Sequence, residues 1–352
     1  VDITGTATTV AVEAKVSAVG AITLAAGTSL TLAAAGDIAS DKNSGTAVTL
    51  RGPGGISTAG DVTTLGGDVV FENAVVLTGD ISLSTVSGGS TGVVRFKGTV
   101  DGTTSGGESL SITGKLETSS SVGVTTALES LSVSGGSALA GGTTVQTAGG
   151  QTYSGATTSA GAVTVRAGVG SLVAFLGDVA LGDLVTTGDA YDVKLTGAKV
   201  AITDQVTFLN TGVVTLGDEA TDSLTFDGGV TSTAASVTNL GGSIAMSDDA
   251  ATFGKVFLGA ATTVATGTAA STFSGTVDGG QSLAVTSTGT TTFGGAVGGT
   301  TALTSLTTDA GGTTAINGGS VKTSGANGQV YGDSVTLGKN TVLDAASGAI
   351  TF

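Results

Sequence analysis

The sequence predicts an all-β chain that folds as a parallel β-solenoid, a stack of coils whose strands form parallel ladders. Three observations indicate this fold: short runs in which apolar and hydroxyl side chains alternate, glycine turns between the runs, and a long internal repeat. Of the 352 residues, 61 are glycine and only one is proline. Since Thr, Val, Ser and Gly are poor helix formers, we expect strands rather than helices.

The strand runs place two apolar side chains on one face and Ser or Thr on the other, as period-two alternation requires. The clearest runs are residues 21–24, 29–32, 47–50, 80–83, 109–112, 162–165, 223–226 and 334–337.

Turns follow the strands every eight to twelve residues. They contain Gly-Gly, Asp-Gly and Asn-Gly steps, such as Asp101-Gly102 and Asn317-Gly318, in which a positive φ is easily reached. This spacing fits a sandwich, a barrel or a solenoid, so the internal repeat has to decide among them.

The repeat spans about half of the chain. Residues 62–67 return as 237–242, and residues 98–102 return as 275–279, at an offset of about 176 residues. Further matches pair residues 125–131 with 300–306, 151–153 with 329–331, and 48–50 with 224–226. We therefore predict two repeat blocks of one continuous rod, residues 1–176 and 177–352.

An early match, residues 20–24 with 212–216, has a wider offset of about 192 residues. It predicts about 16 extra residues near positions 33–46 of the first block. Such an insertion changes the strand number of a closed sheet, whereas a stack of coils accepts it as part of a coil. We expect coils of about 20 to 25 residues, and about 14 to 18 of them.

The composition excludes several classes of function. The chain has no histidine and no cysteine, so the commonest general base, thiolate nucleophiles, structural zinc and disulfides are all missing. With 27 acidic against 12 basic residues, we expect no nucleic-acid partner and no binding to anionic lipid. The most apolar stretch, residues 172–185, is interrupted by Asp178 and Asp183, so we expect no membrane insertion.

Residues 20–38, Gly-Ala-Ile-Thr-Leu-Ala-Ala-Gly-Thr-Ser-Leu-Thr-Leu-Ala-Ala-Ala-Gly-Asp-Ile, resemble the repeats of filamentous-haemagglutinin-like exoproteins and autotransporter-type adhesins of Gram-negative bacteria. The resemblance lies in the repeat texture of the whole chain and in no functional residue. It implies a right-handed parallel β-helix rod, export through the outer membrane, and roles in adhesion, biofilm or surface layers. The chain ends also look like the middle of a coil array, which predicts a segment of a longer protein.

Three sequence patterns bear on catalysis or nucleotide binding. Residues 88–92 match the nucleophile-elbow pattern G-x-S-x-G, but a serine nucleophile needs a base, and a glycine turn explains the match. No lysine that follows a glycine precedes Ser or Thr, so no P-loop is present. The pair Asp248 and Asp249 is the best candidate for a polysaccharide depolymerase, although adjacent strand residues point to opposite faces.

The cluster Asp218, Glu219 and Asp222 could also act on a glycosidic bond or bind calcium through its carboxylate oxygens. A solvated turn is the simpler interpretation, and calcium is the only cofactor that these residues suggest. Phe71, Phe96, Phe226, Phe253, Phe273 and Phe293 occupy strand positions. We expect them to stack in the core, and a sugar-binding stripe is the alternative.

The leading hypothesis is a non-catalytic structural rod of a secreted bacterial surface protein, outside the cell or on its surface. It would serve as an adhesin stalk or as a subunit of an extracellular filament, sheath or surface layer. Its partners would be cell-surface or matrix components, with self-assembly into filaments as one outcome. The alternatives are a glycan-binding adhesin face and a β-helical polysaccharide depolymerase.

Overall fold

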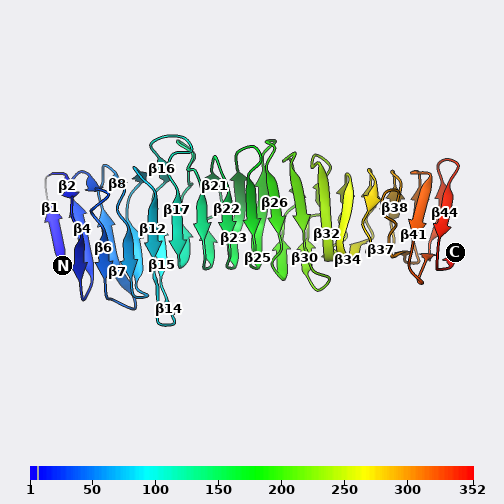
Figure 1. Ribbon diagram of the computed structural model, residues 1–352, viewed down its shortest axis with the longest axis horizontal. Coiled ribbons are helices and arrows are strands. Elements are labelled where there is room, and N and C mark those ends of the chain that lie inside the picture. Colours follow the sequence, from blue (N-terminus) through cyan, green and yellow to red (C-terminus); the bar gives the residue numbers. More distant parts are fainter. Residues whose placement is uncertain (6–7) are drawn as a thin grey trace. The chain divides into compact units, whose positions relative to one another are not determined.

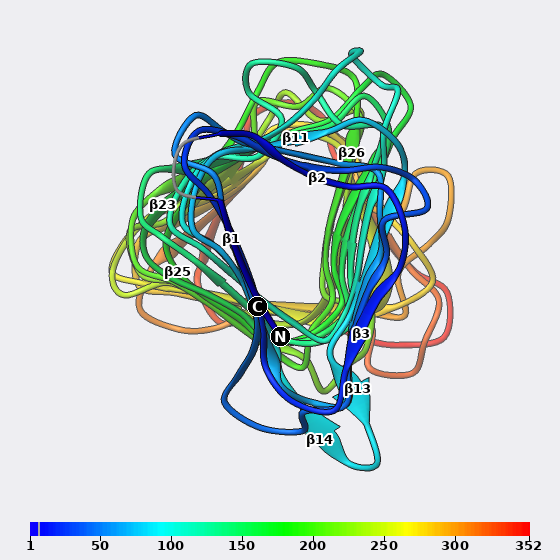
Figure 2. The ribbon, with the colours of Figure 1, turned by 90° about the vertical axis from the view of Figure 1, so that its left-hand side faces the viewer.

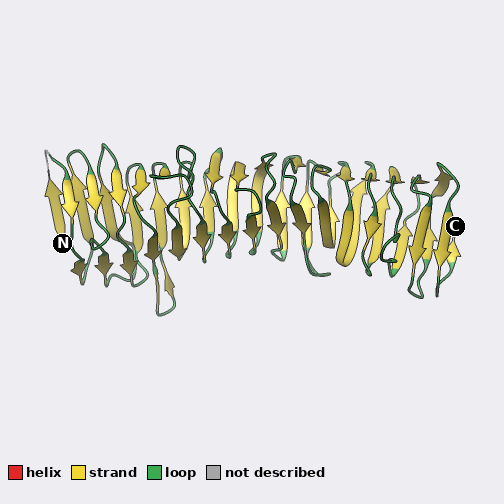
Figure 3. Cartoon of the chain, turned by 45° about the horizontal axis from the view of Figure 1, so that its top comes forward, coloured by secondary structure: helices red, strands yellow, loops and turns green. Residues whose placement is uncertain are grey.

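A computed structural model describes residues 1–5 and 8–352. All of its regular secondary structure is β-strand, and Figure 3 shows strands joined by loops throughout the described chain. The strands stack in parallel and form a β-solenoid of about 17 turns over the described residues. The predicted all-β solenoid fold is therefore confirmed. The chain divides into two compact units, Val1–Gly177 and Asp178–Phe352, and each is described by itself.

Each coil of unit 1 contributes one strand to each of three parallel ladders, and Figure 2 shows β1, β2 and β3 on three sides of the first coil. The first ladder consists of β1 (Asp2–Gly5), β4 (Ile22–Ala26), β7 (Thr46–Arg51), β10 (Asp68–Phe71), β15 (Val93–Phe96), β18 (Lys115–Thr118), β20 (Ser137–Leu139) and the start of β23 (Thr157–Arg166). The second consists of β2 (Val10–Val12), β5 (Leu30–Leu32), β8 (Ile56–Thr58), β11 (Val75–Leu77), β16 (Val100–Gly102), a bridge at Val122, β21 (Thr143–Gln146) and the end of β23. The third consists of β3 (Val16–Ala18), β6 (Ile38–Ser40), β9 (Val62–Thr64), β12 (Ile81–Ser84), β17 (Leu110–Thr113), β19 (Leu131–Val133), β22 (Gln151–Tyr153) and β24 (Leu172–Phe175).

Unit 2 follows the same plan, and Figure 1 labels many of its strands. Ladder A consists of the start of β25 (Val179–Thr186), β27 (Lys199–Ile202), β30 (Ser223–Phe226), the ends of β32 (Val237–Ala245) and β34 (Val256–Gly267), β37 (Ser282–Ser287), β39 (Ser305–Thr308), β42 (Gln329–Tyr331) and β45 (Ile350–Thr351). Ladder B consists of β28 (Val206–Thr207), β31 (Val230–Ser232), β33 (Ala251–Phe253), β35 (Ser271–Phe273), β38 (Thr290–Phe293), β40 (Thr313–Ile316) and β43 (Ser334–Leu337). Ladder C consists of β26 (Asp192–Leu195), β29 (Val213–Leu216), the starts of β32 and β34, β36 (Val277–Asp278), a bridge at Val297, β41 (Ser320–Thr323) and β44 (Val342–Ala345).

Aromatic side chains stack inside the coils, from one coil to the next. Phe71 and Phe96 have ring centroids 4.7 Å apart. In unit 2 the rings of Phe253 and Phe273 are 5.7 Å apart, and those of Phe273 and Phe293 are 5.3 Å apart. These five residues and the sixth predicted one, Phe226, are all buried, so the predicted core position of the phenylalanines is confirmed.

The two units contain the same buried polar contact. In unit 1 the amide of Gln151 donates to two backbone carbonyls, at 3.1 and 2.8 Å, and accepts the hydroxyl of Tyr153 at 3.3 Å. In unit 2 Gln329 donates to two backbone carbonyls at 3.2 and 2.9 Å and accepts the hydroxyl of Tyr331 at 2.9 Å. The sequence repeat is therefore also a repeat of side-chain contacts.

The strand pairing corrects one detail of that repeat. In unit 1, β6 pairs with β9. The repeat of β9 in unit 2 is the start of β32, because residues 237–242 repeat residues 62–67. The strand that pairs with the start of β32 is β29. β29 therefore takes the place of β6, and not that of β4 as the match of 20–24 with 212–216 predicts. The coil from Ile22 to Val48 is 26 residues long and the coil from Val200 to Leu224 is 24, so the first block has no insertion of about 16 residues near 33–46. The prediction was wrong because neighbouring coils share one sequence texture, so a match can slip to another strand.

A small antiparallel hairpin, β13 (Val86–Ser87) and β14 (Ser90–Thr91), interrupts unit 1 and projects from the coil in Figure 2. Its base is closed by Gly92, whose N–H donates to the Thr85 carbonyl at 2.8 Å, and by the Thr85 hydroxyl, which donates to the Gly92 carbonyl at 2.9 Å. In unit 2 the corresponding segment is the end of β34, a strand of ladder A. The pairing of the preceding strand also differs between the units. In unit 1, β12 pairs with β17. In unit 2, the start of β34 pairs with β36, whose sequence repeats that of β16.

Truncation of the central ring in the unit 2 stack should strongly destabilise the fold. Replacing Phe273 with Ala leaves a cavity between Phe253 and Phe293, and we expect a loss of about 3 to 5 kcal/mol in the free energy of unfolding. Urea unfolding followed by circular dichroism measures it. The outward Thr272→Ala variant is the control, and equal losses in both variants would contradict the stacked core.

Alkaline pH should destabilise the protein through its buried phenols. Burial raises the pKa of Tyr153 and of Tyr331 above the ordinary value for tyrosine. The unfolded chain releases these protons near pH 10, while the folded chain retains them to higher pH. The free energy of unfolding should therefore stay constant in this respect up to about pH 9 and fall as the pH rises above about 10. A Tyr153→Phe/Tyr331→Phe double variant should lose less over the same range, and an equal loss would refute this origin.

Candidate functional site

Many of the acidic side chains lie at the corners of the coils and hold the next coil in place. Asp61 Oδ1 accepts the backbone N–H of Ser82 at 2.7 Å, and Asp192 Oδ1 accepts that of Val213 at 2.7 Å. The same contact to the following coil is made by Asp37, Asp68, Asp80, Asp178 and Asp248. Because corners interrupt the ladders, these carboxylates satisfy backbone donors that the strands leave unpaired.

One corner carboxylate is duplicated between the units. Asp101 Oδ1 accepts two successive backbone N–H groups of the next coil, at 2.8 and 3.2 Å. Its repeat, Asp278, accepts two such groups at 2.7 and 3.1 Å. Both aspartates are buried, which explains why the Gly-Thr-Val-Asp-Gly segment is repeated.

The predicted calcium cluster forms a turn between β29 and β30. Asp222 is 5% exposed, and its Oδ2 accepts the backbone N–H groups of Asp218 and Glu219, both at 3.0 Å. The carboxylate of Asp218 pairs instead with Lys194 at 3.1 Å. Within residues 1–5 and 8–352, no group of three or more acidic side chains is arranged to hold a metal ion. A turn held by the buried Asp222 carboxylate accounts for these two hydrogen bonds, and calcium binding stays a prediction.

The aspartate pair proposed for glycosidic chemistry lies at another corner. Asp248 has a positive φ of 65°, and its Oδ1 accepts the Thr268 N–H at 2.9 Å. Both Asp248 and Asp249 are exposed. The contact of Asp248 is the coil-to-coil contact of the other corner aspartates, so this pair fits the same structural role.

The segment that matches the nucleophile elbow forms the hairpin β13–β14. Gly88 and Gly89 have φ of 55° and 88° and make its turn, and Ser90 pairs with Ser87 across it. The turn interpretation of residues 88–92 is therefore confirmed. The chain contains no histidine that could take the proton of Ser90.

A charged patch lies on the outer face of the first ladder of unit 1. Arg95 binds Asp68 at 2.6 Å and Glu117 at 2.8 Å, and Lys97 binds Glu72 at 2.9 Å. The hydrogen bond to Asp68 is the main cause that raises the pKa of Arg95. These pairs join successive coils, and as partly exposed pairs each contributes modestly to stability.

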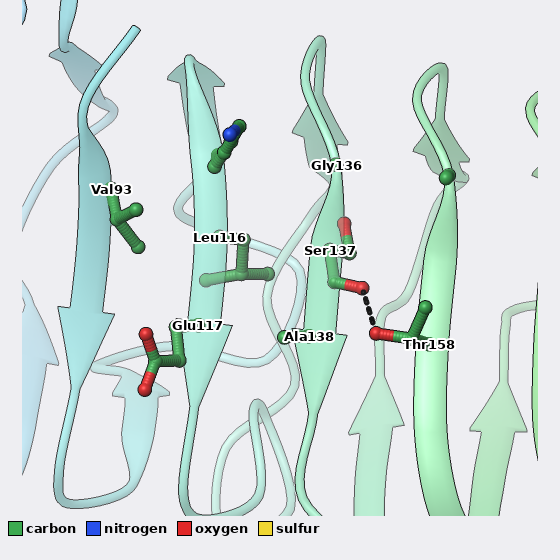
Figure 4. A pocket seen from close by; sticks show the side chains of 9 residues that line it. Val93, Leu116, Glu117, Gly136, Ser137, Ala138 and Thr158 are labelled. Atoms are coloured by element: carbon green, nitrogen blue, oxygen red, sulfur yellow. Dashed lines mark hydrogen bonds between the residues drawn. The ribbon is translucent and has the colours of Figure 1, made fainter.

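A shallow hollow of about 200 Å³ adjoins this patch on β15, β18, β20 and β23 (Figure 4). The side chains around it include Val93, Leu116, Glu117 and Ala138, and the Thr158 hydroxyl donates to the Ser137 carbonyl at 3.4 Å. Glu117 is already paired with Arg95. The hollow brings together mostly small and apolar groups, which can bind a ligand but do not form a nucleophile–base pair.

One outward aromatic residue was missed by the sequence analysis. Phe257 is 45% exposed, although the six predicted core phenylalanines are buried. The run Val256-Phe257-Leu258 is uniformly apolar, so its inward and outward positions are not separated by hydropathy. The outward direction of Phe257 could have been predicted from Lys255 and Gly259, because residues two positions apart in a strand lie on the same face.

Comparison of the chain with protein-family models, with curated proteins and with solved structures finds no match in any of the three. Over the described residues, no helix has the length and apolar character needed to cross a bilayer.

Loss of the Asp222 carboxylate should destabilise unit 2. We expect Asp222→Ala to lower the free energy of unfolding by about 1 to 2 kcal/mol, because two backbone N–H groups of the turn lose their acceptor. Asp222→Asn retains an acceptor oxygen and should lose less. Urea unfolding with and without added calcium provides the measurement. Calcium-dependent stabilisation of the wild type that vanishes in Asp222→Ala would instead support the metal site.

Proposed function

We propose that the chain is a non-catalytic structural segment of a secreted bacterial surface protein. In this proposal it serves as an adhesin stalk or as a subunit of an extracellular filament, sheath or surface layer. Its partners are components of the cell surface or matrix, and it acts outside the cell or on its surface.

The observation that carries the proposal is the strand register of each unit. Inward columns continue from coil to coil, such as Leu24 with Leu50 and Leu50 with Phe71. A stack of this kind gains length simply by adding coils, because each coil contacts only its neighbours. That property suits a spacer, whose purpose is to set a distance.

Two further observations support the same role. The corner aspartates use their carboxylates to hold adjacent coils, so much of the acidic excess has a structural use. The texture of residues 20–38 also resembles that of filamentous-haemagglutinin-like exoproteins, in which such coils serve adhesion and surface layers.

A structural spacer should tolerate the removal of one whole coil. Val213 pairs with Val237, so deletion of residues 213–236 joins equivalent points of successive coils. We expect this variant to remain β-rich and to unfold cooperatively, as judged by circular dichroism and thermal melting.

The matched control removes half a coil, residues 213–224, which joins ladder C to ladder A and disrupts every following ladder of unit 2. We expect this variant to lose cooperative unfolding of unit 2. If both deletions unfold the protein equally, the coils are not interchangeable and the spacer proposal fails.

A further inference from the structure

The outer surface of unit 2 carries many small residues and a few larger apolar side chains, among them the ring of Phe257. Outward positions of ladder B, for example, are Thr207, Thr231, Thr252, Thr272 and Thr292 in successive coils. On ladder C, by contrast, Phe257 is 45% exposed. The strand that carries this ring is paired on both sides, so the ring stands on a fixed backbone with part of its surface open to a ligand.

The backbone fixes the direction of this ring. Val256 and Leu258 are buried, and Lys255, Phe257 and Gly259 alternate with them on the exposed side of the chain. Lys255 and Phe257 are two residues apart, about 6.6 Å along the strand. Glycine at position 259 leaves the other side of the ring without a bulky neighbour.

The adjacent coil adds polar groups beside the ring. Asn239 is the register partner of Phe257, about 4.8 Å away across the ladder. Its Nδ2 donates to the Thr215 hydroxyl at 3.3 Å. The Oδ1 of Asn239 has no hydrogen-bond partner within residues 1–5 and 8–352, so it is available to accept one from a ligand.

One cationic side chain near the ring is available to an anion, although the chain as a whole is acidic. Lys255 is exposed and makes no ion pair within the described part of the chain, although acidic residues outnumber basic ones by more than two to one. The other neighbour of Phe257, Asp278, is 7% exposed, and its carboxylate is held by the N–H groups of Thr300 and Thr301. Within the described part of the chain, Lys255 therefore carries an ammonium group without an ion-pair partner, two residues before the ring.

We propose that Asn239, Lys255 and Phe257 form a binding site for an acidic sugar, a hexuronate residue of a polysaccharide. The apolar C–H face of the sugar stacks on the Phe257 ring, its carboxylate binds the Lys255 ammonium, and a hydroxyl donates to Asn239 Oδ1. The site does not depend on the spacer role, because a rigid coil can present it whether or not the chain sets a distance.

The ladder itself argues against an extended peptide as the occupant. Peptides that add to sheets bind the free backbone groups of an edge strand. The start of β34 is paired with β32 on one side and with β36 on the other. A ligand at this surface can therefore contact side chains only. The ring of Phe257, the amide of Asn239 and the ammonium of Lys255 together suit a carboxylated sugar.

The test uses the full chain and isothermal titration calorimetry with three sets of oligomers: oligogalacturonate, oligoglucuronate and alginate fragments. At least one should bind, and its methyl-esterified form should bind more weakly because the carboxylate is lost. We expect Phe257→Thr to weaken binding at least tenfold. Lys255→Gln should weaken binding of the acid and leave that of the ester unchanged, and added salt should reduce the difference.

The matched controls are Lys322→Gln, an outward lysine of β41, and Leu209→Thr, an exposed apolar residue elsewhere in unit 2. Both should bind as the wild type does. The proposal is overturned if no hexuronate oligomer binds at millimolar concentration, or if the two controls weaken binding as much as Phe257→Thr. Thermal melting of each variant separates lost binding from lost folding, and the coil-deletion result bears on the spacer role alone.

Discussion

Parallel pairing between successive coils decides which residues this fold accepts at each position. Strands inside the ladders are paired to the coil before them and the coil after them, so their backbone groups are satisfied only if neighbouring coils keep the same register. That requirement places like residues above like residues, as in the column Phe253, Phe273 and Phe293. The narrow interior then selects the Val, Leu, Ile and single aromatic rings that fill it.

At the corners the chain leaves the ladders, so backbone N–H groups near the strand ends have no strand partner. Aspartate has a short side chain whose carboxylate accepts a backbone N–H of the next coil. Glycine adopts the positive φ that a tight turn requires. The acidic excess and the high glycine content of the sequence therefore have a common structural origin in the corners. Both residues occur at the corners, and both are needed for coils to close.

The sequence was informative where a pattern has a single physical explanation. Alternating runs and glycine turns predicted strands and corners, and the strand positions of the phenylalanines predicted the stacked core. It was misleading where neighbouring coils look alike, since residues 20–24 match 212–216 although β29 takes the place of β6. Phe257 was missed because an apolar run of three residues does not reveal which side faces outward. The contacts of Asp222 depend on a turn geometry that composition alone does not specify.

The hairpin β13–β14 leaves the coil and returns to it through a base closed by Thr85 and Gly92, and the ladders continue beyond it. Coil closure is thus independent of what the excursion contains. Thr85–Gly92 is accordingly a natural grafting position, where an epitope or an enzyme-cleavable tag can replace the two short strands and be carried clear of the scaffold.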